Sequence, residues 1–558
     1  MISIPAVRFA LIGTLLGVGA ALAARDAAGA QDPGQVRYAP DRAEGEGPFA
    51  RLIIRGVNLI DGTGAPPRGP VDIVIEGNRI ADIVSVGVPR VPVQADRRPT
   101  GATREIDATG WYALPGFVDI HVHTGEVPKA PEAEYMYKLW LAHGITTTRG
   151  VGYGPLEWSL HERERGARNE ITAPRMFVYE RPGGGWGQGP VRTPEQARAW
   201  VRWLAEQGVD GMKLGLSGET PEVMAALLEE GAARKLGSTA HLAQNMVAGA
   251  NALDAARMGL GTLTHYYGLF EALYAGNDVQ PWPADMNYND EQQRFGQVAR
   301  QWNLIHPRGS PEWNALIQAF LDLDLTLDPT MTAYLASRDV MRRRTADWHQ
   351  TYTLPSLWDY YQPSRTNHGS YYYDWTTWDE TAWREFYRVW MQFLNDYKNA
   401  GGRVTVSSDA GFIYNLYGFS TIEEMELLQE AGFHPLEVIR GATMHAAETL
   451  LAPNGRPIEF GVLRPGLLAD VVLVKENPIH DLKVLYGTGA VRLNDETGRA
   501  ERRGGIRYTI KDGIVYDAKQ LLADVAAMVE AQKRERGITT LPDVAWASGE
   551  QVPRRVGR

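Results

Sequence analysis

The fold of this chain is decided by the stretch Leu114–His123, which reads LPGFVDIHVH. Its apolar run from Phe117 to Ile120 predicts a short buried strand, and His121 and His123 follow at the end of that strand. Residues i and i+2 of a strand point to the same side. The two imidazoles are therefore expected to face one point, as two ligands of one metal ion do, although such a pair also occurs without any metal.

Downstream of this strand, apolar runs alternate with helical patterns. Two helix starts are well marked, because Thr193-Pro194-Glu195 and Thr220-Pro221-Glu222 each place Thr at the N-cap and Pro in the first turn. Further strands are expected at 145–148, 174–179, 209–214, 238–241, 261–265, 325–329 and 403–409. This alternation predicts βα units with a parallel sheet, and eight such units close a barrel.

Short strands and turn signals flank the barrel segment on both sides, without room for helices before residue 114. We interpret the two flanks as halves of one small β-sandwich. The predicted organisation is a signal peptide (1–30), a flexible lead-in (31–50), the first part of the sandwich (51–114), the barrel (115–452), the second part of the sandwich (453–516), and a C-terminal helix and tail (517–558).

The first thirty residues are typical of an export signal. Arg8 precedes an apolar run, 9–23, and there are two small-x-small cleavage candidates, Ala21–Ala23 at the end of this run and Ala28–Ala30 after it. We expect a periplasmic or secreted protein with no stable membrane span after signal cleavage. A retained N-terminal anchor is the alternative.

The composition excludes several classes of function. The formal net charge is −10, which argues against a nucleic-acid binder, since that class needs a basic face. The chain contains no Cys, so a disulfide scaffold and a thiolate metal site are both excluded. A metal site must therefore use His, carboxylates or a modified side chain.

A long insertion, about 333–400, separates the last two expected strands and is rich in Trp and Tyr. Insertions after a barrel strand fall on the catalytic face, and long ones often cover the active site. We expect Tyr371–Trp375 to line a pocket. The alternative, that the aromatic residues pack against the insertion's own helices, is preferred for most of the others.

Six side chains with metal-binding chemistry lie at the carboxyl ends of expected strands. They are His121, His123, Lys213, His241, His265 and Asp409. In a β/α barrel these strand ends meet at one face, where functional residues gather. A single His at such a place is more often an ordinary core residue, but the coincidence of six favours a metal centre.

Lys213 lies between Met212 and Leu214 at the end of an apolar strand. An ammonium group there, beside divalent cations, would be disfavoured by desolvation and by like charge. The neutral amine can react with carbon dioxide to give a carbamate, whose two oxygens can bridge two metals. An ordinary lysine extending to the barrel rim is the alternative. Asp409 would bind one metal and accept a proton from a bridging water.

With these motifs, residues 51–480 resemble the amidohydrolase superfamily, and within it the imidazolonepropionase- and prolidase-like metal-dependent dipeptidase branch. Besides Leu114–His123, the resemblance is carried by 208–214 (GVDGMKL), Ala240-His241, Thr264-His265, 407–411 (SSDAG), 441–447 (GATMHAA) and 461–470 (GVLRPGLLAD).

The resemblance implies a distorted TIM (β/α)8 barrel with a flanking β-sandwich. It implies two divalent metal ions, usually zinc: His121, His123 and Asp409 on the more buried ion, His241 and His265 on the other, and carboxylated Lys213 between them. It further implies a hydrolase of amide or peptide C–N bonds, in which a bridging hydroxide attacks the carbonyl and Asp409 passes the proton to the leaving amine.

Two departures put a dipeptide specificity in doubt. Trp186 stands where relatives often carry His in a Gly-Gly-His-Gly stretch, and the aromatic insertion is long. Hydrolysis of an ester, lactone or organophosphate on the same centre is the main alternative. A deaminase is disfavoured, because Gln244 replaces the Glu that deaminases often place three residues after the His.

Other classes have less support. A non-catalytic binding protein is disfavoured because all six ligand positions are intact, and a structural surface protein because the sequence has no repeats. We expect a small-molecule substrate and no nucleic acid, and the sequence leaves a homo-oligomer open.

Overall fold

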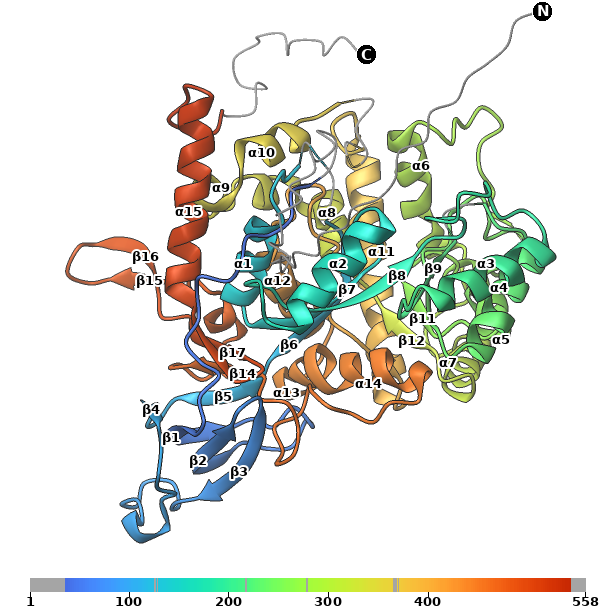
Figure 1. Cartoon of the computed structure of the whole chain (residues 1–558). Coiled ribbons are helices and arrows are strands. Elements are labelled where there is room, and N and C mark those ends of the chain that lie inside the picture. The colour runs from blue at the N-terminus through green and yellow to red at the C-terminus, as the bar shows by residue number, and fades with distance from the viewer. Residues whose placement is uncertain are drawn as a thin grey trace, which may run out of the picture.

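The computed structural model describes residues 36–124, 127, 129–215, 218–276, 279–364, 369 and 371–542 (Figure 1). The predicted signal peptide, 1–30, lies outside the described residues, as does the end of the tail from 543 onward. Within the described part of the chain, none of the helices combines the length and the apolar character that a membrane crossing requires.

Eight parallel strands form the central sheet, and each pairs with its neighbours in chain order. They are β6 (Phe117–Val122), β7 (Ile145–Gly150), β8 (Arg175–Glu180), β9 (Gly211–Leu214), β10 (Gly237–Ala240), β11 (Thr262–Thr264), β12 (Thr326–Asp328) and β13 (Arg403–Val404). All eight coincide with strands expected from the sequence. The α/β class is confirmed, and the curled sheet agrees with a TIM-like barrel.

The two edge strands of this sheet, β6 and β13, approach each other through irregular backbone. The Asp409 N–H donates to the carbonyl of His121 at 2.9 Å, and the Ser408 N–H donates to Oδ1 of Asp119 at 3.1 Å. Because the Asp119 side chain takes the place of part of the backbone hydrogen bonding between these strands, only 403–404 of the predicted strand 403–409 is regular. The same irregular segment places Asp409 beside the end of β6.

Helices cover the sheet between the strands. They are α1 (Ala133–Ala142), α2 (Leu156–Ala167), α3 (Pro194–Glu206), α4 (Pro221–Ala233), α5 (Ala252–Arg257), α7 (Pro311–Asp322), α12 (Phe419–Glu430), α13 (Pro435–Arg440) and α14 (Ala446–Leu451). Both predicted N-caps are confirmed, since the hydroxyls of Thr193 and Thr220 accept backbone N–H groups of the first turn. A π-helical turn, Gly441–His445, joins α13 to α14.

The strands on both sides of the barrel segment belong to one second sheet, in the order β18-β17-β14-β5-β1-β2-β3, with β4 beside β1. Their bounds are β1 (Leu52–Leu59), β2 (Arg68–Glu76), β3 (Arg79–Ser85), β4 (Arg104–Asp107), β5 (Tyr112–Pro115), β14 (Val471–Val474), β17 (Ile506–Lys511) and β18 (Ile514–Asp517). Figure 1 shows the early strands in blue and the late ones in red side by side. A β-rich unit built from both flanks is thus present.

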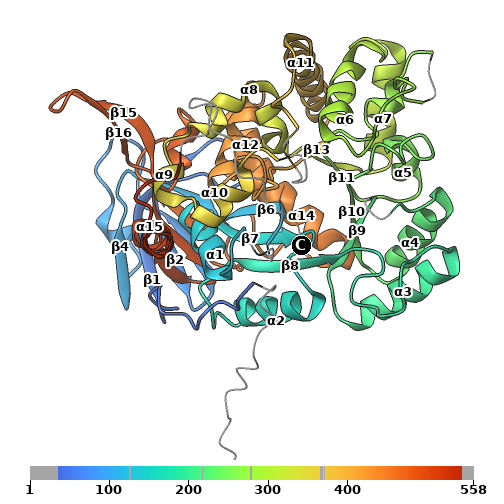
Figure 2. The same ribbon diagram turned by 90° about the horizontal axis from the view of Figure 1, so that it is seen from above.

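Two other late elements lie outside these sheets. Helix α15 (Ala518–Glu535) packs against α1 and includes the predicted terminal helix. A hairpin of β15 (Ala490–Asn494) and β16 (Arg499–Arg503) extends outward from the body in both views (Figures 1 and 2).

Two insertions lie beyond the carboxyl ends of β11 and β12. The first contains α6 (Glu291–Val298) and was not expected. The second is the predicted aromatic insertion, with α8 (Leu335–Arg344), α9 (His349–Tyr352), α10 (Pro355–Tyr361) and α11 (Thr377–Asn399). The two insertions are joined by hydrogen bonds, such as the indole N–H of Trp375 to the carbonyl of Gln292 at 3.2 Å. Most of the insertion's aromatic residues pack internally, as those of α11 do.

A buried group of charges connects the amino end of the barrel sheet to the β-rich sheet. This basal cluster consists of Arg175, Asp470, Lys511 and Asp512. The Arg175 guanidinium binds Asp470 at 2.7 Å and Asp512 at 2.5 Å. Lys511 Nζ donates to two oxygens at the end of α2, at 2.6 and 2.7 Å. Each charge in the cluster therefore has an opposite charge or a hydrogen-bond partner.

Candidate metal centre

The six predicted residues gather at the carboxyl ends of the strands, and we call them the mouth cluster: His121, His123, Lys213, His241, His265 and Asp409. The Asp409 carboxylate lies 3.6 Å from Nε2 of His121, 3.2 Å from Nε2 of His123 and 3.6 Å from Nε2 of His265. The rings of His241 and His265 lie 4.7 Å apart. His121, His123 and Asp409 bring their ligand atoms within 4.8 Å of one another.

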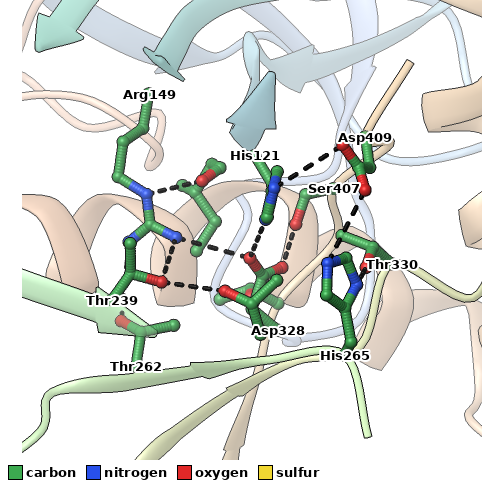
Figure 3. A network of polar contacts seen from close by, with 12 residues as sticks. His121, Arg149, Thr239, Thr262, His265, Asp328, Thr330, Ser407 and Asp409 are labelled. Atoms are coloured by element: carbon green, nitrogen blue, oxygen red, sulfur yellow. Dashed lines mark hydrogen bonds and ion pairs between the residues drawn. The ribbon is translucent and has the colours of Figure 1, made fainter. Parts of the chain in front are cut away.

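The neighbours of two imidazoles fix which ring nitrogen faces the cluster. The Thr330 hydroxyl donates its hydrogen to the Pro329 carbonyl at 2.7 Å, so it accepts a hydrogen bond from Nδ1–H of His265. Nδ1 of His121 has no hydrogen bond from the described residues, but the Asp328 carboxylate lies 3.6 Å away and its charge favours a proton on that nitrogen. In both rings Nε2 then carries the lone pair, and it points toward Asp409 (Figure 3).

Burial keeps these groups in the state that metal binding needs. Desolvation, with the charge of Lys213 and of neighbouring imidazoles, holds the pKa of His121, His241 and His265 well below the usual range, and it also lowers the pKa of His123. The imidazoles are therefore neutral. Burial lowers the pKa of Lys213 to about 7, and its Nζ has no hydrogen-bond partner among the residues that the structure describes.

Three residues of this region have left-handed backbone conformations. The φ angles are +65° at His265, +46° at Thr330 and +48° at Asp409. Such angles are uncommon outside glycine, and a β-branched residue like Thr330 is strained there. His265 and Asp409 are expected metal ligands, and Thr330 orients His265. Contacts within the site, rather than intrinsic conformational preference, therefore determine the backbone angles of these three residues.

A second layer of charge lies inside the barrel behind the ligands (Figure 3). Arg149 of β7 is fully buried and reaches Asp328 of β12 at 3.3 Å, Thr239 of β10 at 3.3 Å and the Ile120 carbonyl of β6 at 2.5 Å. These strands are not sheet neighbours of β7, apart from β6, so Arg149 crosses the interior. Through Asp328, which also accepts the Ser407 hydroxyl, this layer supports His121.

A cavity of about 520 Å³ opens above the mouth cluster. Its walls contain both insertions: Tyr288, Arg294 and Phe295 come from the first, Tyr334, Tyr360 and Tyr371 from the second. Of the stretch Tyr371–Trp375, expected to line a pocket, only Tyr371 is part of the wall; Trp375 packs against Trp383. The sequence did not indicate the first insertion, although Asp290, which caps α6, is a recognisable N-cap.

The donor atoms fit divalent metal ions. Neutral imidazole nitrogens and carboxylate oxygens are the ligands of zinc and similar ions in proteins. The Nε2 lone pairs of His121 and His265 face the oxygens of Asp409 at 3.6 Å, a repulsive arrangement unless a cation lies between them. Lys213 Nζ and Asp409 Oδ1 are buried polar atoms without a hydrogen bond from the described residues, as expected if their partner is not a protein group.

Comparison with known proteins identifies sequence relatives that match part of the chain. No family model matches the sequence. The chain is 34% identical over 146 residues to adenine deaminase 2 of Rhizobium etli, a match that covers 26% of this chain and 22% of that protein. It is 28% identical over 221 residues to N-acyl-D-aspartate deacylase of Alcaligenes xylosoxydans xylosoxydans, covering 39% of this chain and 37% of the relative. The chain thus matches well under two thirds of either relative.

The fold resembles that of solved hydrolase structures. A Xaa-Pro dipeptidase crystallised with methionine in its active site superposes with a TM-score of 0.54, covering 84% of this chain and 100% of the dipeptidase at 18% identity. At that identity the likeness concerns the fold. Together, the two sequence relatives and the structural neighbour confirm the predicted resemblance to the amidohydrolase superfamily.

Proposed function

We propose that this relative of the amidohydrolases is a metal-dependent hydrolase of amide or peptide C–N bonds. The observation that carries the proposal is the convergence of three imidazole Nε2 atoms on the carboxylate of Asp409, at 3.2–3.6 Å, beside a buried lysine amine. The relatives, a deaminase and a deacylase by name, act on bonds of the same class.

In the proposed centre, His121, His123 and Asp409 would hold one divalent ion, and His241 and His265 would hold the other. Lys213, as a carbamate, would supply a further anionic ligand. Its lowered pKa, about 7, supports this role, since a neutral amine can add carbon dioxide and release a proton. Zinc is the ion that such a set of ligands usually binds.

Two bound divalent ions would lower the pKa of a water molecule, so that it can act as the nucleophile, and would polarise the substrate carbonyl. The reaction adds water across the C–N bond and yields a carboxylic acid and an amine. Asp409 would accept a proton from the attacking water and pass it to the departing nitrogen. Arg149 and Asp328 are not part of the cavity wall. Asp328 would help to orient His121 from behind, and Arg149 pairs with Asp328.

The proposal extends to the surroundings of the centre. We infer a complete, distorted (β/α)8 barrel with a flanking sandwich, and export to the periplasm by the segment 1–30. The substrate is a small molecule that fits the cavity of about 520 Å³.

The test is a substrate panel on protein loaded with two equivalents of zinc. N-acyl amino acids, dipeptides, lactones, esters and phosphotriesters are compared, with metal content measured in parallel. We expect amide hydrolysis that is lost with the metal on chelation. Asp409→Asn should lower turnover about 10²- to 10⁴-fold with an unchanged circular dichroism spectrum. Turnover of only lactones, esters or phosphotriesters would replace the amide assignment with one of those classes.

A further inference from the structure

The loop after β13 contains a tight turn, residues 412–415, which we call the wall turn. It is closed by the Asn415 N–H, which donates to the Phe412 carbonyl at 2.7 Å. The φ angles of its two central residues are +50° at Ile413 and +61° at Tyr414. Positive φ at both central positions is the pattern of a type I′ turn, in which Gly, Asn and Asp predominate. A β-branched residue such as Ile413 is strained in that conformation.

The wall turn connects the cavity wall to the loop that carries Asp409. Phe412 and Ile413 line the cavity, and the ring of Phe412 lies edge-on to that of His123, with the ring centres 5.7 Å apart. The Gly411 N–H, two residues after Asp409, donates to the carbonyl of the last residue of the turn at 3.0 Å. A change in the turn would therefore move both the wall and the loop at Asp409.

The wall turn is held by the second insertion, above all by Arg343 near the end of α8. Nη2 of Arg343 donates to the Tyr414 carbonyl at 3.2 Å and also to Oδ1 of Asn415. Its Nη1 pairs with Glu423 of α12, and the Arg343 side chain is only 1% exposed. The Tyr361 hydroxyl of α10 donates to the Asn415 carbonyl. One buried guanidinium thus joins two helices to the strained turn.

A second arginine of α8 shows which of these contacts is particular to Arg343. Arg338 pairs with Glu430 of α12 at 2.7 and 3.1 Å, and its guanidinium lies 5.0 Å from the ring centre of Tyr387. Within the described part of the chain, Arg338 has no hydrogen bond or ion pair with the wall turn. An arginine–glutamate pair is therefore sufficient to join α8 to α12 without any contact to the turn.

We propose that Arg343 is a positioning residue for the proposed hydrolysis: by holding the wall turn in its strained form, it keeps Asp409 and Phe412 in place. Strained backbone persists only where the surrounding structure over-determines it. The planar guanidinium can donate to two acceptors of the turn at once while it pairs with a carboxylate. Without Arg343, the two central residues would be free to return to negative φ, and the loop before them would shift. The inference rests on the proposed function, but its test does not require turnover.

The test compares two double variants, each of which removes one arginine–glutamate pair between α8 and α12. Arg343→Met with Glu423→Gln removes the contact to the turn without leaving a buried carboxylate unpaired. Arg338→Met with Glu430→Gln is the matched control. Hydrogen exchange, followed by mass spectrometry on metal-free protein, should be about tenfold faster for the amides of 410–418 in the first variant and unchanged in the control.

Zinc affinity is the second measurement, because Asp409 is an expected ligand. The Kd for zinc, measured by competition with a chelating dye, should rise about 10- to 100-fold in the Arg343 double variant, as for other groups that orient metal ligands. It should stay near the wild-type value in the control. Arg343→Lys can still pair with Glu423 but lacks the fork that reaches both acceptors of the turn, so both effects should be intermediate. Arg343→Lys carries the same test if the double variant does not fold.

The outcomes separate this inference from the proposed function. Unchanged exchange over 410–418, or unchanged zinc affinity, in the Arg343 variants would overturn the positioning role. Equal effects in the two double variants would also overturn it, because packing between α8 and α12 would then be the cause. If exchange and affinity change as expected while wild-type protein hydrolyses none of the amides tested, the amide hydrolysis fails and the role of Arg343 in holding the metal-binding loop stands.

Discussion

Buried charges gather at both ends of the barrel sheet, and the two groups differ in how their charges are satisfied. In the basal cluster, Arg175 pairs with Asp470 and Asp512 at 2.7 and 2.5 Å, and Lys511 donates to two oxygens. In the mouth cluster, Lys213 Nζ and Asp409 Oδ1 have no hydrogen bond from the described residues. Buried charge is present in both clusters and does not distinguish them. Buried polar atoms without a hydrogen-bond partner do distinguish them, and they lie in the mouth cluster, where the proposed site is.

The largest effects are expected from replacing Lys213, the lysine of the mouth cluster. Lys213→Met should lose most bound metal and at least about 10³-fold in turnover, because the variant cannot form the proposed carbamate ligand. The metal-free variant should be more stable than metal-free wild type by about 1–3 kcal/mol, since an unsatisfied buried amine is replaced by an apolar side chain. Metal analysis and urea denaturation check both effects.

A matched pair of variants tests the carbamate itself. Lys213→Ala leaves room for a small carboxylate in place of the carbamate, so acetate or propionate should restore part of the metal and turnover. Lys213→Met fills the same space and should show no rescue. Full metal occupancy in unsupplemented Lys213→Ala would disprove the bridging role.

The opposite result is expected at the basal cluster. Arg175→Met leaves Asp470 and Asp512 as buried carboxylates without their main counter-charge, so the free energy of unfolding should fall by about 3–5 kcal/mol. Turnover per folded molecule should stay near the wild-type value at a temperature where the variant is folded. Loss of turnover without loss of stability would show that the two clusters are not separable.

Smaller effects are expected from the few hydrogen bonds that the mouth cluster does make. Thr330→Val keeps the shape of the side chain but removes the hydroxyl that accepts from Nδ1–H of His265. Zinc affinity should fall about 10- to 100-fold, as for other groups that orient metal ligands. Thr330→Ser is the control, because it keeps the hydroxyl, and competition with a chelating dye measures the affinity. Equal affinities in both variants would remove Thr330 from the ligand-positioning set.

The smallest effect concerns pH and the basal cluster. Burial alone would raise the pKa of Asp512, but Arg175 and Lys511 hold it below the usual value. The unfolded chain then binds this proton at a higher pH than the folded protein does. The resulting stability is present above about pH 4 and is lost as the pH falls through the lower, folded value. Urea unfolding at pH 5 and pH 3 should therefore show a smaller loss for Asp512→Asn than for wild type.

Much of the mouth cluster could be predicted because each of its residues lies at the end of an expected strand, and a parallel barrel brings strand ends together. Arg149 and Asp328 carried no comparable signal. Both lie within expected strands or at their ends, and their role appears only when β7 and β12 meet across the barrel interior. The role of Thr330 could not be predicted from the sequence either, because its left-handed backbone conformation is imposed by its surroundings.

The cavity walls, which come from the two insertions, were predicted less well than the mouth cluster below them. In Tyr371–Trp375 the aromatic residues are adjacent along the chain, but successive side chains point in different directions, so Tyr371 reaches the cavity and Trp375 does not. The short helix α6 was missed because its polar sequence has few apolar positions to reveal a helical period. Local pattern thus located the ligands, whereas the substrate walls depend on contacts between two distant insertions.

The pairing of β5 with β14 has a consequence for how this protein is made. Pro115 lies opposite Val471, and the whole barrel sequence separates them. During synthesis, the early strands leave the ribosome long before their partner exists, and β5 keeps an open edge until then. We expect the newborn chain to depend on a chaperone over this interval, and the β-rich sheet to be the last part of the molecule to mature.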